Sequence, residues 1–513
     1  MTRQIRLVSG FLTVGVWTLL SKVLGFVRDV MIASALGSGP SAQALLVAFA
    51  LPNMFRRFFA EGAFSTAFVP MFSKKIESGE GAEDFAREAF SGLATIVLAL
   101  TLIAQVFMPF LVWAMASGFA GDERFDMTVD FGRIVFPYIL FISLAALLSG
   151  VLNAMGRFAV AAAAPVFLNI ILISAMVFAQ IWGFDIAKSI IWAMPFAGVV
   201  QMGIVWFAAK SAGIHIIPRR PRLSPEMKRL AIIAAPAALA GGVVQINLLV
   251  GRQVASYFDG AVAWLSYADR LYQLPLGVVG IAIGVVLLPD LSRKLRAGDA
   301  AGGAHSLNRA AEFSMMLTVP AAAALIVIPL PLVSVLFGRG AFTTEDAIAT
   351  ALAVAIYGAG LPAFVLAKVV APLFFAREDT RRPFHYALIS MVINVVIAIG
   401  LSPWFGFLAA AIGTSVAAWI MLAQLVLGSR KLDGAPTLDA RLKRIIPKIL
   451  IASAVMAATL YFAAVGLNTY LETPTVRYVA LAGLVISGVV VYAGVILASG
   501  AMRAGDLRKL LRR

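Results

Sequence analysis

Apolar runs of membrane-spanning length recur from one end of this 513-residue chain to the other. A bilayer core of about 30 Å requires roughly 20 apolar residues in a helix, and a helix satisfies all of its own backbone groups there. A mean hydropathy of +0.93 with only 13% charged residues excludes an ordinary soluble domain. The sequence therefore predicts an all-α polytopic membrane protein with fourteen transmembrane helices. The fourteen runs are approximately 7–36, 43–72, 86–116, 131–155, 160–183, 186–210, 227–257, 262–290, 306–337, 347–375, 383–402, 405–428, 444–467 and 476–499.

Basic residues gather on alternate connections between these runs. One side carries clusters such as 219–222, 293–296 and 441–444, together with both ends of the chain, whereas the other side has only scattered bases such as Arg124 and Lys188. Cytoplasmic loops of membrane proteins are enriched in Lys and Arg in this way, so we expect both termini to be cytoplasmic. The same asymmetry explains the net charge of +16 without nucleic-acid binding.

An internal repeat is visible in the sequence. A shift of 219 residues places 69–75 on 288–294, and a shift of 225 aligns Asn169 with Asn394 and Arg157 with Arg382. These matches predict two six-helix repeats in parallel orientation plus two extra C-terminal helices, although chance similarity among fourteen helices is the alternative. The predicted domains are an N-terminal lobe at 1–215, a C-terminal lobe at 225–430, and two additional helices with a basic cytoplasmic tail at 440–513.

Several fixed charges lie inside the predicted spans. A central charge costs an inserted helix about 2.5–3.5 kcal/mol, so these side chains must face protein or water. The cations outnumber the carboxylates by two, and arginine binds phosphate through its planar fork, so the excess favours an anionic cargo such as a diphosphate. Buried ion pairs that only fix helix packing are the alternative. The cations are Lys22, Arg28, Arg56, Arg57 and Arg270, and the carboxylates are Asp29, Glu61 and Asp269.

Other chemistry lacks candidate residues. The chain has no cysteine, and its three histidines have no companion at ligand spacing, so we expect no metal site. No phosphate-binding loop or nucleophile triad is present in the sequence, so we expect that the protein is not an enzyme and binds no cofactor.

Three motifs resemble a known family. They are Ser21–Asp29, Leu51–Ser65 and Tyr267–Leu271, and they are similar to signatures of the bacterial lipid II flippase family MurJ (MviN). The resemblance covers essentially the whole chain and implies a member of the multidrug/oligosaccharidyl-lipid/polysaccharide exporter superfamily. It implies a flippase of the bacterial cytoplasmic (inner) membrane that moves undecaprenyl-diphosphate-linked lipid II from the inner to the outer leaflet by alternating access, with a central cationic cavity for the diphosphate.

The resemblance also assigns roles to residues. Arg28, Arg56 and Arg270 match essential cavity arginines of the family, and Lys22 occupies the place of another. Asp29 and Glu61 match acidic companions of these arginines. Two departures are that Lys22 lacks the bidentate fork and that Gln43 stands where the family often has an aspartate. The family's last two helices form a groove for the lipid tail, which fits the two spans outside the repeat.

The sequence bears less directly on the energy source of transport and on the binding partners. No carboxylate lies within the seventh or eleventh span, so the sequence does not support coupling of transport to sodium. The candidate energy sources are then the membrane potential or the gradient of another ion. We expect lipid II as the ligand, cell-wall synthesis proteins as partners, and no nucleic acid. The alternatives are an exporter of another lipid-linked oligosaccharide or of cationic drugs, a lipid-modifying enzyme, and a membrane scaffold of cell-wall synthesis.

Overall fold

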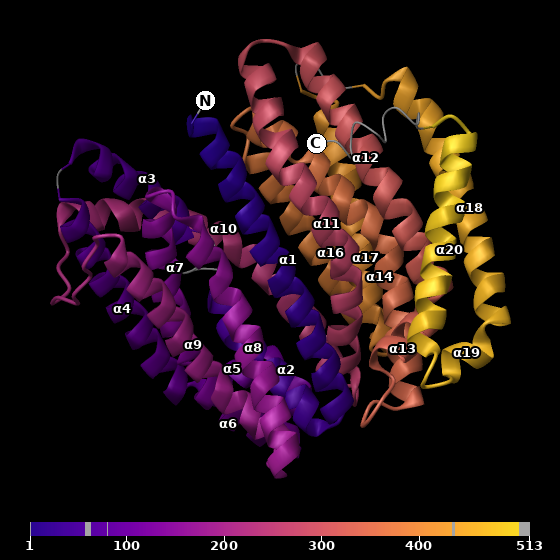
Figure 1. Ribbon diagram of the computed structural model, residues 1–513, viewed down its shortest axis with the longest axis horizontal. Helices are drawn as coiled ribbons and strands as arrows, with labels where there is room; N and C mark the ends of the chain where they lie inside the picture. Colours follow the sequence, from indigo (N-terminus) through magenta and orange to yellow (C-terminus); the bar gives the residue numbers. More distant parts are fainter. Residues whose placement is uncertain (1, 57–62, 80, 433–436, 502–513) are drawn as a thin grey trace. The chain divides into compact units, whose positions relative to one another are not determined.

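A computed structural model describes residues 2–56, 63–79, 81–432 and 437–501, and all regular structure within them is helical (Figure 1). The predicted all-α class is confirmed. The helices of the first half are α1 Thr2–Leu36, α2 Pro40–Arg56, α3 Ala63–Ser78, α4 Ala82–Val106, α5 Met108–Met115, the 3₁₀ helix η2 Ser117–Phe119, α6 Glu123–Val135, α7 Tyr138–Ala154, α8 Phe158–Trp182, α9 Ile186–Ser211 and α10 Pro225–Ser256. Those of the second half are α11 Ala261–Arg296, α12 Ala300–Val327, α13 Pro329–Phe337, α14 Thr344–Val370, α15 Pro372–Phe375, α16 Arg381–Phe405, α17 Leu408–Ser429, α18 Ala440–Gly466, α19 Asn468–Glu472 and α20 Arg477–Ala498.

Ten stretches of the described residues are long and apolar enough to cross a membrane. The other four predicted spans coincide with α1, with α2 and α3, with α10 and with α11, so the count of fourteen stays a prediction. Bulky apolar side chains on the spans point outward, as on Phe207, Trp404 and Phe462, each more than 70% exposed. Such surfaces are tolerated by a protein that faces lipid, and the chain is a multi-pass membrane protein.

Side-chain caps begin many of the helices. Asp122 accepts a hydrogen bond from a backbone N–H at the start of α6, Asp185 does so for α9, and Asp439 for α18. Thr343 begins α14 in a capping box with Asp346. Each cap satisfies one of the N–H groups that the first helical turn leaves without a partner.

The structure supports the internal repeat more directly than the sequence did. Two spans predicted as single helices, 86–116 and 306–337, are each broken, at Phe107 and at Ile328, because a proline follows in the first turn of the next helix. These breaks lie 221 residues apart, and the starts of α6 and α14 are separated by the same interval. A duplicated unit explains equal spacing of both features.

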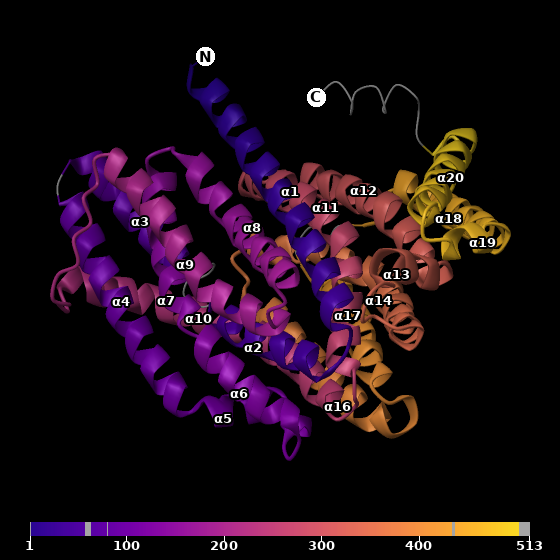
Figure 2. The ribbon, with the colours of Figure 1, turned by 60° about the horizontal axis from the view of Figure 1, so that its bottom comes forward.

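Contacts group the chain into two compact units, Met1–Ala263 and Trp264–Arg513. In the first, α8 packs against α1 and α9, and α7 packs against α9 (Figure 2). In the second, α14 packs between α12 and α17, and α18 packs on α12 and α20. Helix α10, with which the predicted C-terminal lobe begins, groups with the first unit, and the predicted lobe boundaries stay a prediction.

Charged residues join α12 to the start of α18 in the second unit. Glu312 is 5% exposed and accepts hydrogen bonds from Arg309 and from Arg441, the latter at 2.8 Å. Arg309 also pairs with Asp439, and Asn308 accepts from the Asp439 N–H at 3.3 Å. The pairing compensates for the burial of Glu312.

The C-terminal end of α10 is clamped against η2 within the first unit. The Gln253 Oε1 atom accepts from both the N–H and the hydroxyl of Ser117, each at 2.8 Å, and Nε2 donates to the Ala114 carbonyl at 2.7 Å. Gly118 N–H donates to the Ser256 hydroxyl at 2.9 Å. A Cβ atom on Gly118 would lie 2.5 Å from the Ser256 carbonyl carbon, so only glycine allows this approach.

Candidate functional site

Arg28 and Asp29 form an ion pair on α1. Arg28 Nε and Nη2 donate to Asp29 Oδ1 at 3.0 and 2.7 Å, and the two side chains are only 14% and 10% exposed. Neighbouring positions on a helix point about 100° apart, but the long arginine side chain bends back far enough to reach the carboxylate. The pairing offsets the cost of burying either charge.

Asn169 on α8 holds the other side of Arg28. Its Oδ1 atom accepts from Arg28 Nη1 at 2.9 Å, and its Nδ2 atom donates to the Ser21 carbonyl of α1 at 3.0 Å. Asn169 is 5% exposed, so these bonds lie in a largely dry environment where they are strengthened. Sequence reasoning used Asn169 only as a mark of the repeat and missed it as a site residue.

The Arg28 guanidinium keeps donors for a ligand. Arginine has five N–H groups, and the described residues engage three of them, through Asp29 and Asn169. The remaining two are one on Nη1 and one on Nη2, the two nitrogens of the guanidinium fork. Such a fork suits two oxygens of one phosphate or carboxylate.

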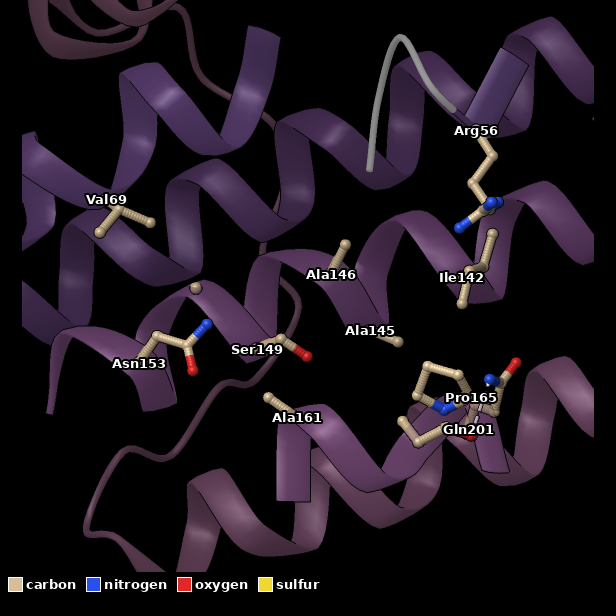
Figure 3. A pocket seen from close by; sticks show the side chains of 12 residues that line it. Arg56, Val69, Ile142, Ala145, Ala146, Ser149, Asn153, Ala161, Pro165 and Gln201 are labelled. Carbon is tan, nitrogen blue, oxygen red and sulfur yellow. Dashed lines mark hydrogen bonds between the residues drawn. The ribbon is translucent and has the colours of Figure 1, made fainter. Parts of the chain in front are cut away.

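A second cation, Arg56, ends α2 at the rim of a groove in the same unit. Its Nε atom donates to Asn53 Oδ1 at 3.2 Å, which ties the side chain to its own helix. Figure 3 shows the guanidinium pointing toward Ile142 of α7, with Ser149 and Asn153 farther along that helix. The groove has a volume of about 270 Å³.

The groove is built largely from small side chains. One stripe of α7 supplies positions 142, 145, 146, 149, 150 and 153, which share a face because they recur at intervals of three and four. Ala161, Ala164 and Pro165 of α8 line another side, together with Gln201 of α9, and Val69 of α3 completes the lining. Among the described lining residues the only charge is that of Arg56, so the groove fits an anionic or a neutral polar group.

The other predicted site residues are placed less completely. Lys22 is an exposed residue of α1, six positions before Arg28. Asp269 and the exposed Arg270 lie on α11 of the second unit, where Asp269 accepts a hydrogen bond from Gln273. Arg57 and Glu61 lie outside the described residues. The roles of all of these residues stay predictions.

Gln43, the departure noted in the sequence, lies at the centre of a polar cluster in the first unit. It is fully buried, and its Nε2 atom donates to Asp259 Oδ1 at 3.0 Å and to the Ser38 carbonyl at 3.1 Å. Its Oε1 atom accepts from Arg124 Nη1 at 3.2 Å. Arg124 also hydrogen-bonds to Asp122, which lowers the pKa of that carboxyl. An amide serves here because it can accept from a cation while donating to a carboxylate.

Metal binding has no geometric support in the described part of the chain, where no three His, Cys, Asp or Glu side chains gather. The expectation that no metal or sodium takes part stays a prediction.

Most of the chain matches one known protein family. Residues 32–480 match the family model described as lipid II flippase MurJ. The chain belongs to the lipid II flippase MurJ family. It is 46% identical over 517 residues to a probable lipid II flippase MurJ of Rhizobium meliloti (strain 1021), covering 99% of this chain and 96% of that protein. It is 35% identical over 428 residues to the lipid II flippase MurJ of Burkholderia cenocepacia, covering 82% of this chain and 83% of that one.

Solved structures agree in fold. A lipid II flippase MurJ in an inward closed conformation aligns with a TM-score of 0.79 at 24% identity, covering 98% of this chain and 99% of that chain. An inward-facing transporter of the multidrug resistance MATE family, of the MOP superfamily, aligns with a TM-score of 0.71 at 16% identity, covering 80% and 94%. The predicted family is confirmed, and membership of the MurJ family makes the chain a transporter rather than an enzyme. The likeness to the MATE transporter extends to the fold, and the predicted superfamily stays a prediction.

Proposed function

We infer that this chain translocates lipid II, the lipid-linked peptidoglycan precursor, across the bacterial cytoplasmic membrane. The family match over residues 32–480 carries this conclusion, together with 46% identity to a probable lipid II flippase over 99% of the chain. The direction we propose is from the inner to the outer leaflet, with both termini cytoplasmic. The concentration of basic residues on one set of connections supports that orientation.

We propose that Arg28 and Arg56 bind the diphosphate of lipid II. The two N–H donors left on the Arg28 fork and the Arg56 guanidinium at the groove rim support this role. Lys22, Arg57 and Arg270 are proposed as further cations of the binding site, with Asp29, Glu61 and Asp269 as their acidic companions. Binding and release alternate between the two membrane faces, and no covalent bond changes.

The lipid tail requires an apolar surface. We propose that α18 and α20 provide it, because both present large exposed apolar side chains such as Phe462 and Val479, 72% and 74% exposed. A membrane potential or a gradient of an ion other than sodium is the energy source we propose, and cell-wall synthesis proteins are the proposed partners.

A depletion experiment tests the function. We expect depletion of this protein to reduce the lipid II that an impermeant probe reaches at the outer leaflet, and re-expression to restore it. Unchanged labelling would exclude lipid II translocation. Arg28→Ala, at normal protein level, should fail to restore labelling, whereas full restoration would remove Arg28 from the binding site while leaving the function intact.

A further inference from the structure

The segment 212–224, which joins α9 to α10, lies along α4 and is called here the basic strap (Figure 2). Its backbone is held by side chains of α4: Arg87 Nε donates to the His215 carbonyl at 2.8 Å, and Glu83 Oε1 accepts from the His215 N–H at 3.1 Å. Ser91 Oγ accepts from the Arg219 N–H at 2.9 Å. Ile216 is 2% exposed and anchors the segment. The strap therefore has a fixed inner side.

The carboxylates beneath the strap are already engaged. Asp84 pairs with Arg219 at 3.0 Å, and Glu88 accepts from the Ser224 hydroxyl at 2.7 Å. At the start of α10, Glu226 pairs with Lys75 of α3 at 2.7 Å. These contacts attach the strap to α4 and the start of α10 to α3, and they occupy the nearby acidic groups.

The outer side of the strap is basic and apolar. Within the described residues, no ion pair or side-chain hydrogen bond engages Arg220 or Arg222, and both are exposed. Lys228 and Arg229 continue the exposed basic surface into the first turns of α10. Two large apolar side chains lie among these cations: Ile217 is 63% exposed and Leu223 is 78% exposed.

The strap connects the end of one predicted membrane span, 186–210, to the start of the next, 227–257. Helix α9, which precedes it, presents Phe207 at 73% exposure one turn before Lys210. Helix α10, which follows it, presents Ile232 at 72% exposure just after Arg229. Both ends of the strap thus adjoin side chains suited to lipid, which places its cations at headgroup level.

We propose that the basic strap binds the phosphates of anionic phospholipids at the membrane surface. Guanidinium groups pair with phosphate oxygens, and clustered Lys and Arg next to a spanning helix attract anionic lipid. Ile217 and Leu223 enter the apolar side of the headgroup layer. This apolar component favours a lipid over an acidic protein segment, which would leave both side chains exposed.

The test compares the full-length protein in nanodiscs of phosphatidylethanolamine with and without phosphatidylglycerol. We expect phosphatidylglycerol to slow amide hydrogen exchange across 212–224, and the purified protein to retain this lipid in native mass spectrometry. Arg220→Gln combined with Arg222→Gln should weaken retention by about tenfold or more, since each cation near an anionic surface contributes separately. Raised salt should weaken it as well.

A matched control removes the same charge elsewhere. Lys443→Gln combined with Arg444→Gln changes two exposed cations in the first turns of α18, and we expect it to keep the exchange protection of the strap. If both double variants lost lipid retention and exchange protection equally, the effect would be one of general charge, and the proposal would be overturned. Exchange that is the same with and without phosphatidylglycerol would overturn it too, and is the outcome expected if the strap binds an acidic protein.

Discussion

Asn169 Oδ1 lies 2.9 Å from Arg28 Nη1 and joins the half-buried arginine of α1 to the middle of α8. The same amide donates back to the α1 backbone at Ser21, so it orients the guanidinium rather than merely touching it. The direction of the free Arg28 donors therefore depends on a residue with no charge of its own.

This relationship predicts the effect of Asn169→Asp. Arg28 already pairs with Asp29, so a second carboxylate at position 169 would leave the cluster with a net negative charge, and we expect roughly tenfold or greater loss of lipid II binding. The change also removes the donor to the Ser21 carbonyl, which should cost about 1–3 kcal/mol of stability. Asn169→Ala leaves a largely buried donor without its partner and should cost about 1–3 kcal/mol of stability as well. Purified protein, titrated with lipid II and melted in detergent, gives both measurements.

Asn308 provides the control for this pair, because it is a comparably buried asparagine at 4% exposure in the second unit. Asn308→Ala should lower the melting temperature and leave lipid II affinity unchanged. If Asn169→Asp binds lipid II as the unaltered protein does, Asn169 has no positioning role.

Filling the groove beside Arg56 should block transport. Ala146 is one of the small residues of the α7 stripe, and Ala146→Phe would place a ring in the space of about 270 Å³. We expect the variant protein to reach normal levels but fail to sustain growth of a depleted strain, because the ring would occupy the space proposed for the lipid II head group. Ile170→Phe adds a ring on a 43% exposed, outward position of α8 and should grow normally. Normal growth of Ala146→Phe would exclude the groove from the transport path.

Gln43→Glu tests the amide between Arg124 and Asp259. The change keeps an acceptor for Arg124 but removes the donor to Asp259 and to the Ser38 carbonyl, so we expect a loss of about 1–3 kcal/mol. Asp259→Asn should restore part of it, about 0.5 kcal/mol, since the Asp259 side chain is 88% exposed and solvent screens the repulsion. Thermal melts of both single variants and the double variant measure this coupling. Strictly additive effects would argue against the bond between Gln43 and Asp259.

The Asp122 carboxyl predicts a pH dependence. Its hydrogen bond to Arg124 lowers its pKa below the ordinary value of 3.8, so its stabilising contribution is full above that value. The contribution disappears as the pH falls through the lowered pKa of the folded protein. We expect Asp122→Asn to melt below the unaltered protein at neutral pH, and the two curves to converge in strong acid. A difference that grows on acidification would contradict the assigned pairing.

The fold class could be predicted from the sequence because membrane spans depend on local composition, which needs no knowledge of neighbours. The cations of α1 and α2 could be predicted for the same reason, since a charge within an apolar run is conspicuous. Asn169 and Arg124 could not, because each acts through a partner 141 or 81 residues away, and an amide within a helix or a base in the first turn of a helix has no distinctive pattern. The helix breaks at Phe107 and Ile328 had a visible signal in the prolines that follow them.

The approach of Gly118 to Ser256 limits how α10 can move. Two backbones this close leave room for no side chain beyond hydrogen, so a shift of α10 along η2 would bring other side chains into collision. It would also break the hydrogen bonds of Gln253 with Ser117, which donates, and with Ala114, which accepts. The end of α10 must therefore travel with α5 and η2 as one piece or detach from them in a single step. If this contact breaks and re-forms during transport, the end of α10 would alternate between two discrete positions without a stable intermediate.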